Sequence, residues 1–304
     1  MRIFTLLTIC LFLAACQQEA EAPSSPPPAA DAPETAAAPA PAETDLLGGI
    51  LASQPEAAQA RYDQRNPRET LEFFGIEPGM TVVEALPGGG WYSKILMPYL
   101  GGEGTLVGVD YAGDMWSKFG FFDDEFIEAK KTWPEEWTAE AQDWGNDDAA
   151  SVSAFVFGAM PSDMAGTADA VLFVRAMHNL ARFESDGGFL TQALADAHSV
   201  LKPGGVVGIV QHHARDEMPD DWADGSRGYL KQGYVVEQME KAGFEYIGSS
   251  DLNSNDKDQP GENDIVWRLP PTLMNAQENE ELKQQMMAIG ESNRMTLKFR
   301  KPEA

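Results

Sequence analysis

Three consecutive glycines, at positions 88–90, follow an apolar run that starts at Val82 and precede a helical pattern. Such a turn lets backbone N–H groups meet a nucleotide-like ligand where a helix begins. Asp110 comes twenty residues after Gly90, at the end of the next apolar run. A carboxylate there can accept hydrogen bonds from a ribose diol. These residues predict a nucleotide-type cofactor, and taken alone they fit a dinucleotide equally well.

Histidines are the candidate acid–base groups. His178 follows the fourth apolar run, and an unperturbed pKa of about 6.5 suits it to taking the proton of a hydroxyl. The alternative for His178 is a structural histidine at a strand end. His212 and His213 follow the fifth run, and one of them must face a pocket if the strand keeps its alternation. His198 lies in a helical pattern and is expected to be structural.

No metal site is predicted. The side chains of the adjacent His212 and His213 diverge, and a ligand set completed by Asp216 and Glu217 is the less favoured alternative.

Short apolar runs alternate with longer amphipathic ones, which favours an α/β sheet with crossover helices. Strands are expected at 81–86, 105–109, 153–157, 170–175, 206–211, 244–249 and 294–300. Helices are expected at 68–74, 91–100, 188–201 and 235–242, with a turn at 202–205. Two long insertions interrupt this pattern. The first, 111–150, is rich in aromatic residues, and the second, 251–293, carries a Trp-Arg-Leu-Pro-Pro stretch. A lid over a pocket and ordinary packing explain them equally well.

Residues 65–303 resemble the class I S-adenosylmethionine-dependent methyltransferases. The family's first motif has an acidic residue and then alternate glycines, and Glu84, Gly88 and Gly90 fall on it. Leu86 stands where the first glycine is usual, and the Pro-Gly-Gly-Gly-Trp-Tyr form resembles a bacterial subgroup of predicted methyltransferases. Asp110 matches the ribose-binding acid of the family.

Later motifs follow in the family's order. Gly158-Ala159-Met160 matches the adenine position, where Ala159 replaces the usual acid, and 169–180 matches the fourth-strand motif that faces the transferred methyl group. The Leu-Lys-Pro-Gly-Gly turn and the strand at 294–302 complete the set. The resemblance implies a Rossmann-like, mostly parallel, doubly wound sheet with an antiparallel last strand. The cofactor-binding residues that it implies are Glu84, Gly88, Gly89, Gly90, Asp110, Ala159 and Arg175.

The implied activity is methyl transfer from S-adenosyl-L-methionine to an oxygen or sulfur nucleophile of a small molecule. In small-molecule O-methyltransferases of the family a His-Asp pair supplies the base, whereas here Asn179 follows His178 and can only orient its ring. A second possibility is a methyltransferase-like lipoprotein that binds a ligand without turnover. An NAD-dependent oxidoreductase is less favoured, because Ser93 stands where its third glycine would be.

The N-terminus resembles a bacterial lipoprotein signal. A positive start, an apolar run to Leu13 and small residues precede Cys16, which would be lipidated after removal of 1–15. Gln17 then favours the outer membrane, facing the periplasm. Cys10 lies in the removed segment, so neither a disulfide nor a thiol site is expected. The Ala/Pro-rich stretch 16–45 is predicted to tether a domain formed by 46–304.

The chain of 304 residues has 22 basic and 48 acidic residues and a formal charge of −26. Nucleic acid is excluded as a partner on this ground, because its binding rests on Lys and Arg neutralising phosphates. A small-molecule substrate and a membrane held through the lipid alone are the expected partners. The sequence indicates no oligomeric state.

Overall fold

A seven-stranded sheet forms the centre of the protein in a computed structural model, which describes residues 45–146 and 148–303. Within them the strand order is β3-β2-β1-β4-β5-β7-β6, and β7 is the strand that runs antiparallel to its neighbours. The strands are β1 (Thr81–Ala85), β2 (Thr105–Asp110), β3 (Ser151–Val156), β4 (Ala168–Val174), β5 (Leu201–His212), β6 (Glu245–Ser250) and β7 (Arg294–Arg300). The predicted α/β class, with a mostly parallel sheet and an antiparallel last strand, is confirmed.

The chain changes direction across the sheet between β1 and β4. From β1 it winds outward through β2 to β3, and it then returns to β4 on the other side of β1. Open α/β sheets form a crevice at the carboxyl ends of the strands where this reversal occurs. The fold therefore sets a ligand site beyond Ala85 and Val174.

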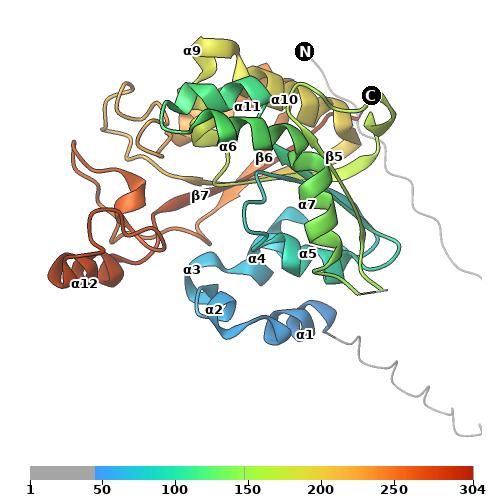
Figure 1. The fold of residues 1–304 in the computed structure, drawn as a ribbon, viewed down its shortest axis with the longest axis horizontal. Helices are drawn as coiled ribbons and strands as arrows, with labels where there is room; N and C mark the ends of the chain where they lie inside the picture. The colour runs from blue at the N-terminus through green and yellow to red at the C-terminus, as the bar shows by residue number, and fades with distance from the viewer. Residues whose placement is uncertain (1–44, 147, 304) are drawn as a thin grey trace, which may run out of the picture. The chain divides into compact units, whose positions relative to one another are not determined.

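Helices cover both faces of the sheet (Figure 1). One face packs against α1, α4, α5 and α7, and the opposite face packs against α8, α10 and α11. The α-helices are α1 (Leu46–Ser53), α2 (Glu56–Gln59), α3 (Tyr62–Arg65), α4 (Pro67–Phe74), α5 (Ser93–Leu100), α6 (Asp124–Ala129), α7 (Trp133–Gln142), α8 (Met177–Arg182), α9 (Glu184–Gly187), α10 (Phe189–Val200), α11 (Gln232–Lys241) and α12 (Glu280–Ile289). Short 3-10 turns are η1 (Gly113–Phe119), η2 (Lys130–Thr132), η3 (Ser162–Met164) and η4 (Val266–Arg268).

Alternation along the strands explains the two layers. Val82 and Leu172 are fully buried against the α4–α5 side, whereas Val83 and Phe173 are buried against the α8–α10 side. Because a parallel sheet is covered on both faces, its strands consist of nearly continuous apolar runs. This is why the strands were predictable to within a few residues.

The first aromatic insertion is largely the crossover between β2 and β3. Helix α7 lies directly on the sheet, since a Cβ added at Gly108 would come within 2.7 Å of the Trp137 ring. Trp137 is 3% exposed. Packing on the sheet, rather than a lid, accounts for the α7 part of this insertion.

The predicted turn at 202–205 is instead a bulge inside β5. Between Leu201 and Val206 the strand advances five residues while its partner β4 advances from Ala168 to Ala170. Gly204 has φ +77° there, a conformation that glycine adopts without strain. The Pro-Gly-Gly sequence thus marks an irregularity of the strand.

Residues 45–303 fall in one compact unit. None of the helices in this part of the chain is both long and apolar enough to cross a membrane. The predicted signal, Cys16 and the tether up to residue 44 lie outside the described residues.

Candidate functional site

A cavity of about 410 Å³ opens at the reversal point of the sheet. The loop after β1 contributes Gly88 and Gly89, Arg175 directly follows β4, His178 lies at the start of α8, and β5 ends in the cavity with His212. Its size lies within the range of small-molecule sites, about 300 to 1,000 Å³. Two of the predicted cofactor glycines, Arg175 and the predicted base therefore share one cavity.

The glycine turn has an unusual backbone. Leu86, which replaces a glycine of the family motif, has φ +55°, and Gly88 and Gly90 have φ +56° and +74°. A leucine in this region is strained by about 1–3 kcal/mol, which is typical of binding sites. No other side chain lies within 4 Å of a Cβ built at Gly88 or Gly89, so their backbone is open to a ligand.

Gly90 differs from the other two glycines. A Cβ added there would come within 2.5 Å of the Trp144 ring, so this glycine is required by the packing of Trp144. Lys94 lies over the same ring, with its Nζ atom 4.5 Å from the ring centroid, and donates a hydrogen bond of 3.1 Å to the Gly89 carbonyl. Gly90 is not among the residues that line the cavity.

Glu84 is buried beneath the glycine turn. Its carboxylate accepts a hydrogen bond of 2.6 Å from Ser93 Oγ at the start of α5. Burial raises the pKa of Glu84 to about 7, and the bond from Ser93 opposes that rise. Glu84 does not line the cavity, and its contact with a cofactor stays a prediction.

Asp110 ends β2 in a pair with a lysine. Lys130 Nζ lies 2.9 Å from Asp110 Oδ2, and the Tyr111 N–H donates to Oδ1 at 2.8 Å. Aromatic rings surround this lysine, with Trp116 nearest at 4.3 Å from its Nζ atom to the ring centroid. Burial raises the pKa of Asp110, and Lys130 opposes that rise. The predicted ribose acceptor is therefore already partnered.

Ala159 lies in an exposed turn after β3. Its N–H donates to the Val156 carbonyl at 3.0 Å, and the preceding Gly158 N–H donates to Asp196 Oδ2 at 2.6 Å. Neither residue lines the cavity, so the structure does not bring Ala159 together with His178.

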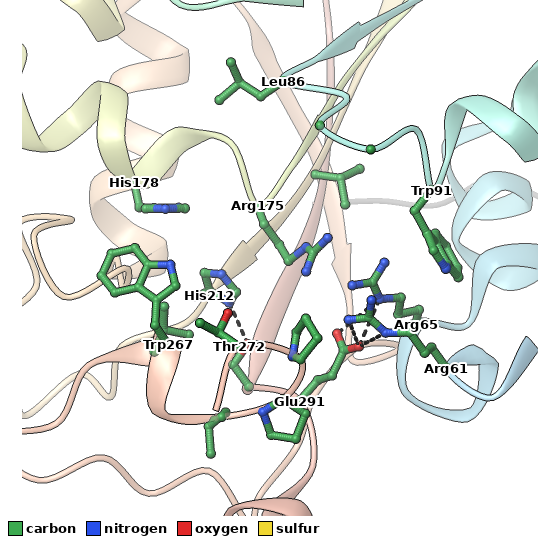
Figure 2. Close-up of a pocket in the computed structure, with 18 of the residues that line it drawn as sticks. Arg61, Arg65, Leu86, Trp91, Arg175, His178, His212, Trp267, Thr272 and Glu291 are labelled. Carbon is green, nitrogen blue, oxygen red and sulfur yellow. Dashed lines mark hydrogen bonds and ion pairs between the residues drawn. The ribbon is translucent and has the colours of Figure 1, made fainter. Parts of the chain in front are cut away.

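Arg175 projects into the middle of the cavity (Figure 2). It has φ +59°, and its backbone N–H donates to the Val210 carbonyl at 2.6 Å. Its buried Nε has no hydrogen-bond partner among the described residues. Burial lowers the pKa of Arg175.

His178 is 6% exposed and lies in the first turn of α8. Burial lowers its pKa to about 4, and the neighbouring Gln211 side chain opposes the shift. Its Nδ1 has no partner within residues 45–146 and 148–303. The imidazole is therefore neutral at neutral pH and has an unused nitrogen.

Asn179 does not orient His178. Its Nδ2 donates to the Tyr111 hydroxyl at 3.0 Å. Successive residues of a helix point in different directions, so the two side chains diverge. The orienting role that the sequence left open for Asn179 is therefore not seen in the structure.

Of the two adjacent histidines, His212 is the one that lines the cavity, as strand alternation requires. Its Nδ1 lies 2.6 Å from Ser292 Oγ, and its ring centroid is 5.5 Å from that of His178. Burial lowers the pKa of His212 well below its usual value, and His178 adds to that effect. His213 is half-buried and lies outside the cavity. No three metal-ligating side chains gather anywhere in the described ranges.

Of the other half of the cavity wall, sequence reasoning pointed only to the stretch around Trp267, in the insertion that either a lid or packing would explain. Arg61 and Arg65 come from α3 and its N-cap, Trp91 follows the glycines, and Trp267 and Glu291 come from the second insertion. Figure 2 shows His178 and Trp267 on one side and the two arginines on the other. The one sequence signal for the arginines was the spacing of Arg61 and Arg65, which places two arginines one helical turn apart in an acidic chain.

In comparisons with known proteins, no family model and no curated protein matches the sequence. Solved structures with a similar fold include the cyclase SpnF, with 15% identity over 79% of this chain and 81% of that chain and a TM-score of 0.48. A SAM-dependent methyltransferase from Aquifex aeolicus has 18% identity over 68% and 93% of the two chains, with a TM-score of 0.44. Geranyl diphosphate methyltransferase in complex with SAM has 15% identity over 86% of this chain and 93% of that chain, with a TM-score of 0.47. Similarity at this level concerns the fold, and the reaction depends on the residues of the site.

Proposed function

We propose that this protein is an S-adenosylmethionine-dependent methyltransferase that acts on the oxygen or sulfur nucleophile of a small molecule. The observation that carries the proposal is the shared cavity of Gly88, Gly89 and His178 at the reversal point of the sheet. Cofactor loops and acid–base groups of open α/β sheets gather at this place.

The donor set is compatible with the cofactor. The open backbone at Gly88 and Gly89 can approach its methionine part closely, because no Cβ intervenes. An ionised carboxylate has about four lone-pair sites, and Asp110 uses two of them, for Lys130 and the Tyr111 N–H. Asp110 does not line the cavity, and we propose that its remaining sites accept ribose hydroxyls from a cofactor that extends beyond it.

The chain's own residues then position an acceptor and move a proton. When bound, the cofactor supplies a methyl group on a positively charged sulfur, which an in-line nucleophile displaces. His178, neutral at neutral pH, takes the proton of a hydroxyl acceptor on an imidazole nitrogen. Trp267, whose ring centroid is 5.8 Å from that of His178, shields the site from water.

Asp110→Ala should weaken S-adenosylmethionine binding by about 1.5–3 kcal/mol, because a hydrogen bond from the ribose to a charged group is lost. Titration calorimetry of the protein with this ligand and with S-adenosylhomocysteine measures the effect. Asp114→Ala, at an exposed acid four residues later, is the matched control. Equal affinities of a folded Asp110→Ala variant and the parent protein would refute the ribose role.

A ligand-binding lipoprotein without turnover is the second candidate, and the pairing of Lys130 with Asp110 favours it. If Lys130 competes with the ribose for the Asp110 carboxylate, Lys130→Gln should bind the cofactor more tightly than the control variant Lys131→Gln, which changes an exposed neighbour. If neither variant nor parent binds the cofactor, the methyltransferase proposal fails and the binding lipoprotein remains.

We also propose that the protein is held by a lipid on Cys16 in the cell envelope, on the outer membrane facing the periplasm. Cys16→Ser should then move it from the membrane fraction to the soluble fraction, because lipidation requires the cysteine thiol. Fractionation followed by immunoblotting gives the result, and Cys10→Ser serves as the control. A Cys16→Ser protein that stays with the membrane contradicts the lipobox assignment.

A further inference from the structure

Four arginines surround one glutamate beside the cavity, and we call Arg61, Arg65, Arg175 and Arg294 with Glu291 the arginine cluster. Arg65 Nε lies 3.0 Å from Glu291 Oε1, and Arg294 Nη1 lies 3.2 Å from Oε2. Arg61 also donates to Oε1, with its Nε at 2.7 Å. Glu291 is therefore fully engaged by three guanidinium groups.

The cavity wall has buried N–H donors that lack acceptors. Arg65 Nη1, Arg175 Nε and Trp91 Nε1 have no hydrogen-bond partner in the part of the chain that the structure describes. Arg65 is 2% exposed, and its guanidinium stacks on the Trp91 ring at 4.5 Å from the centroid. Buried polar groups in folded proteins are normally paired, so these donors can pair with an acceptor that enters the cavity.

The charge of the arginine cluster indicates that the acceptor of these hydrogen bonds is an anion. Glu291 is the one acid among the residues that line the cavity, and three of the four arginines line it. Burial lowers the pKa of Arg65 to about 10, and the positive charge of Arg175 contributes to the shift. A group of cations that burial and mutual repulsion destabilise is stabilised by an anion.

Resting on the proposed function, we infer that the cavity binds an oxyanion, a carboxylate or phosphate, against Arg175 and Arg65, and that the methyl acceptor carries it. Arginine pairs with both anions through two parallel hydrogen bonds. Two sources have this chemistry, the acceptor and the amino-acid carboxylate of the cofactor. S-adenosylmethionine has a zwitterionic amino acid and a sulfonium, so it adds no net negative charge. On this ground we assign the anion to the acceptor, and the carboxylate of the cofactor is the alternative source.

Inorganic phosphate is the probe for the site, titrated into the full chain at constant ionic strength without cofactor. We expect it to bind the parent protein, and Arg175→Gln to weaken it about 10- to 150-fold, the loss of a charged hydrogen bond. Arg300→Gln changes charge equally at a surface pair with Glu245 and should bind like the parent. Melting curves check folding. If Arg175→Gln does not fold, Arg175→Lys replaces it and should still bind more weakly, because it lacks the planar fork.

Cofactor fragments separate the two sources. If the acceptor carries the anion, phosphate also binds protein saturated with S-adenosylhomocysteine. Arg175→Gln then leaves the affinity for S-adenosylhomocysteine unchanged, and this result would replace the cofactor-binding role that the family resemblance implies for Arg175. Two results together would overturn the inference that the acceptor carries the anion. Phosphate and S-adenosylhomocysteine would exclude each other, and Arg175→Gln would weaken the binding of S-adenosylhomocysteine but not of 5′-methylthioadenosine, which lacks the carboxylate. Absence of phosphate binding, or equal binding by Arg175→Gln, overturns the oxyanion site itself. Phosphate binding without any cofactor binding keeps the site and rejects only the methyltransferase proposal.

Discussion

His178→Ala is expected to lower turnover roughly 10²- to 10⁴-fold with a hydroxyl acceptor, while the affinity for S-adenosylmethionine changes little. The reason is that the imidazole lines the cavity and has an unpartnered Nδ1, while the glycine turn that would meet the cofactor lies on a different strand. Release of S-adenosylhomocysteine from a panel of hydroxyl and thiol compounds, with and without carboxylate or phosphate groups, measures turnover. With a thiol acceptor the same substitution should cost far less, because a thiol, with a pKa of about 8.5, loses its proton far more readily than a hydroxyl and its thiolate is a strong nucleophile.

The pH profile gives a second readout of the same role. An unperturbed histidine would make the activity rise between pH 6 and 7. Burial lowers the pKa of His178 to about 4, so the activity should instead stay level through neutral pH and fall only as the pH approaches about 4. The expected limb of the profile therefore lies well below the one that an unperturbed histidine would give.

Two histidine variants serve as controls for this prediction. His198 packs against Phe244 outside the cavity, and His198→Ala should turn over like the parent protein. His212→Ala tests the neighbouring imidazole, whose Nδ1 is already paired with Ser292. A full loss in His212→Ala combined with no loss in His178→Ala would assign the base to β5 instead of α8.

The sheet and the glycine turn were predictable because their signals are local. Buried parallel strands are continuous apolar runs, and the turn after β1 has its glycines in sequence. The order of the strands along the chain then places the cavity where the sheet reverses direction. His178 and the glycines at 88 and 89 meet there, although about ninety residues separate them. For this reason part of the candidate site could be read from motifs.

The arginine cluster could not be read in this way. Arg65 and Glu291 are 226 residues apart, and their pairing depends on how α3 packs against the segment before β7. No periodicity or motif reports such a contact. The pairing of Lys130 with Asp110 was missed for a similar reason, since it depends on how the aromatic rings around Lys130 pack over the end of β2. Sequence patterns thus predicted the backbone of the site better than its charges.

Two buried ionisable groups should give the protein opposite pH dependences that nearly cancel. The pKa of His178 falls from 6.5 to about 4 on folding, so the unfolded chain binds the extra proton between these values. Its contribution to the free energy of unfolding is therefore present above pH 6.5 and is lost as the pH falls toward about 4. The pKa of Glu84 rises from 4.5 to about 7, so its contribution is present below pH 4.5 and is lost as the pH rises toward about 7.

Each contribution amounts to about 3 kcal/mol over its window, because one pKa unit corresponds to about 1.4 kcal/mol. Glu84→Gln should therefore make the free energy of unfolding rise more steeply between pH 4.5 and 7 than in the parent protein, whereas His178→Gln should make it fall over the same range. Urea unfolding at steps of about one pH unit from about pH 4.5 to about pH 7.5 measures these slopes.

The slopes, rather than the overall stabilities, decide this prediction, since either substitution also changes buried contacts. In Glu84→Gln the bond from Ser93 to the carboxylate is lost, and because the amide in its place does not titrate, whatever this contact changes shifts the whole curve without tilting it. Glu77→Gln, at an exposed acid before Gly79, is the control and should keep the slope of the parent protein. If Glu84→Gln and His178→Gln tilt the plot of unfolding free energy against pH in the same direction, one of the two pKa shifts has the wrong sign. Were that group His178, the imidazole would be protonated at neutral pH and could not act as the proposed base.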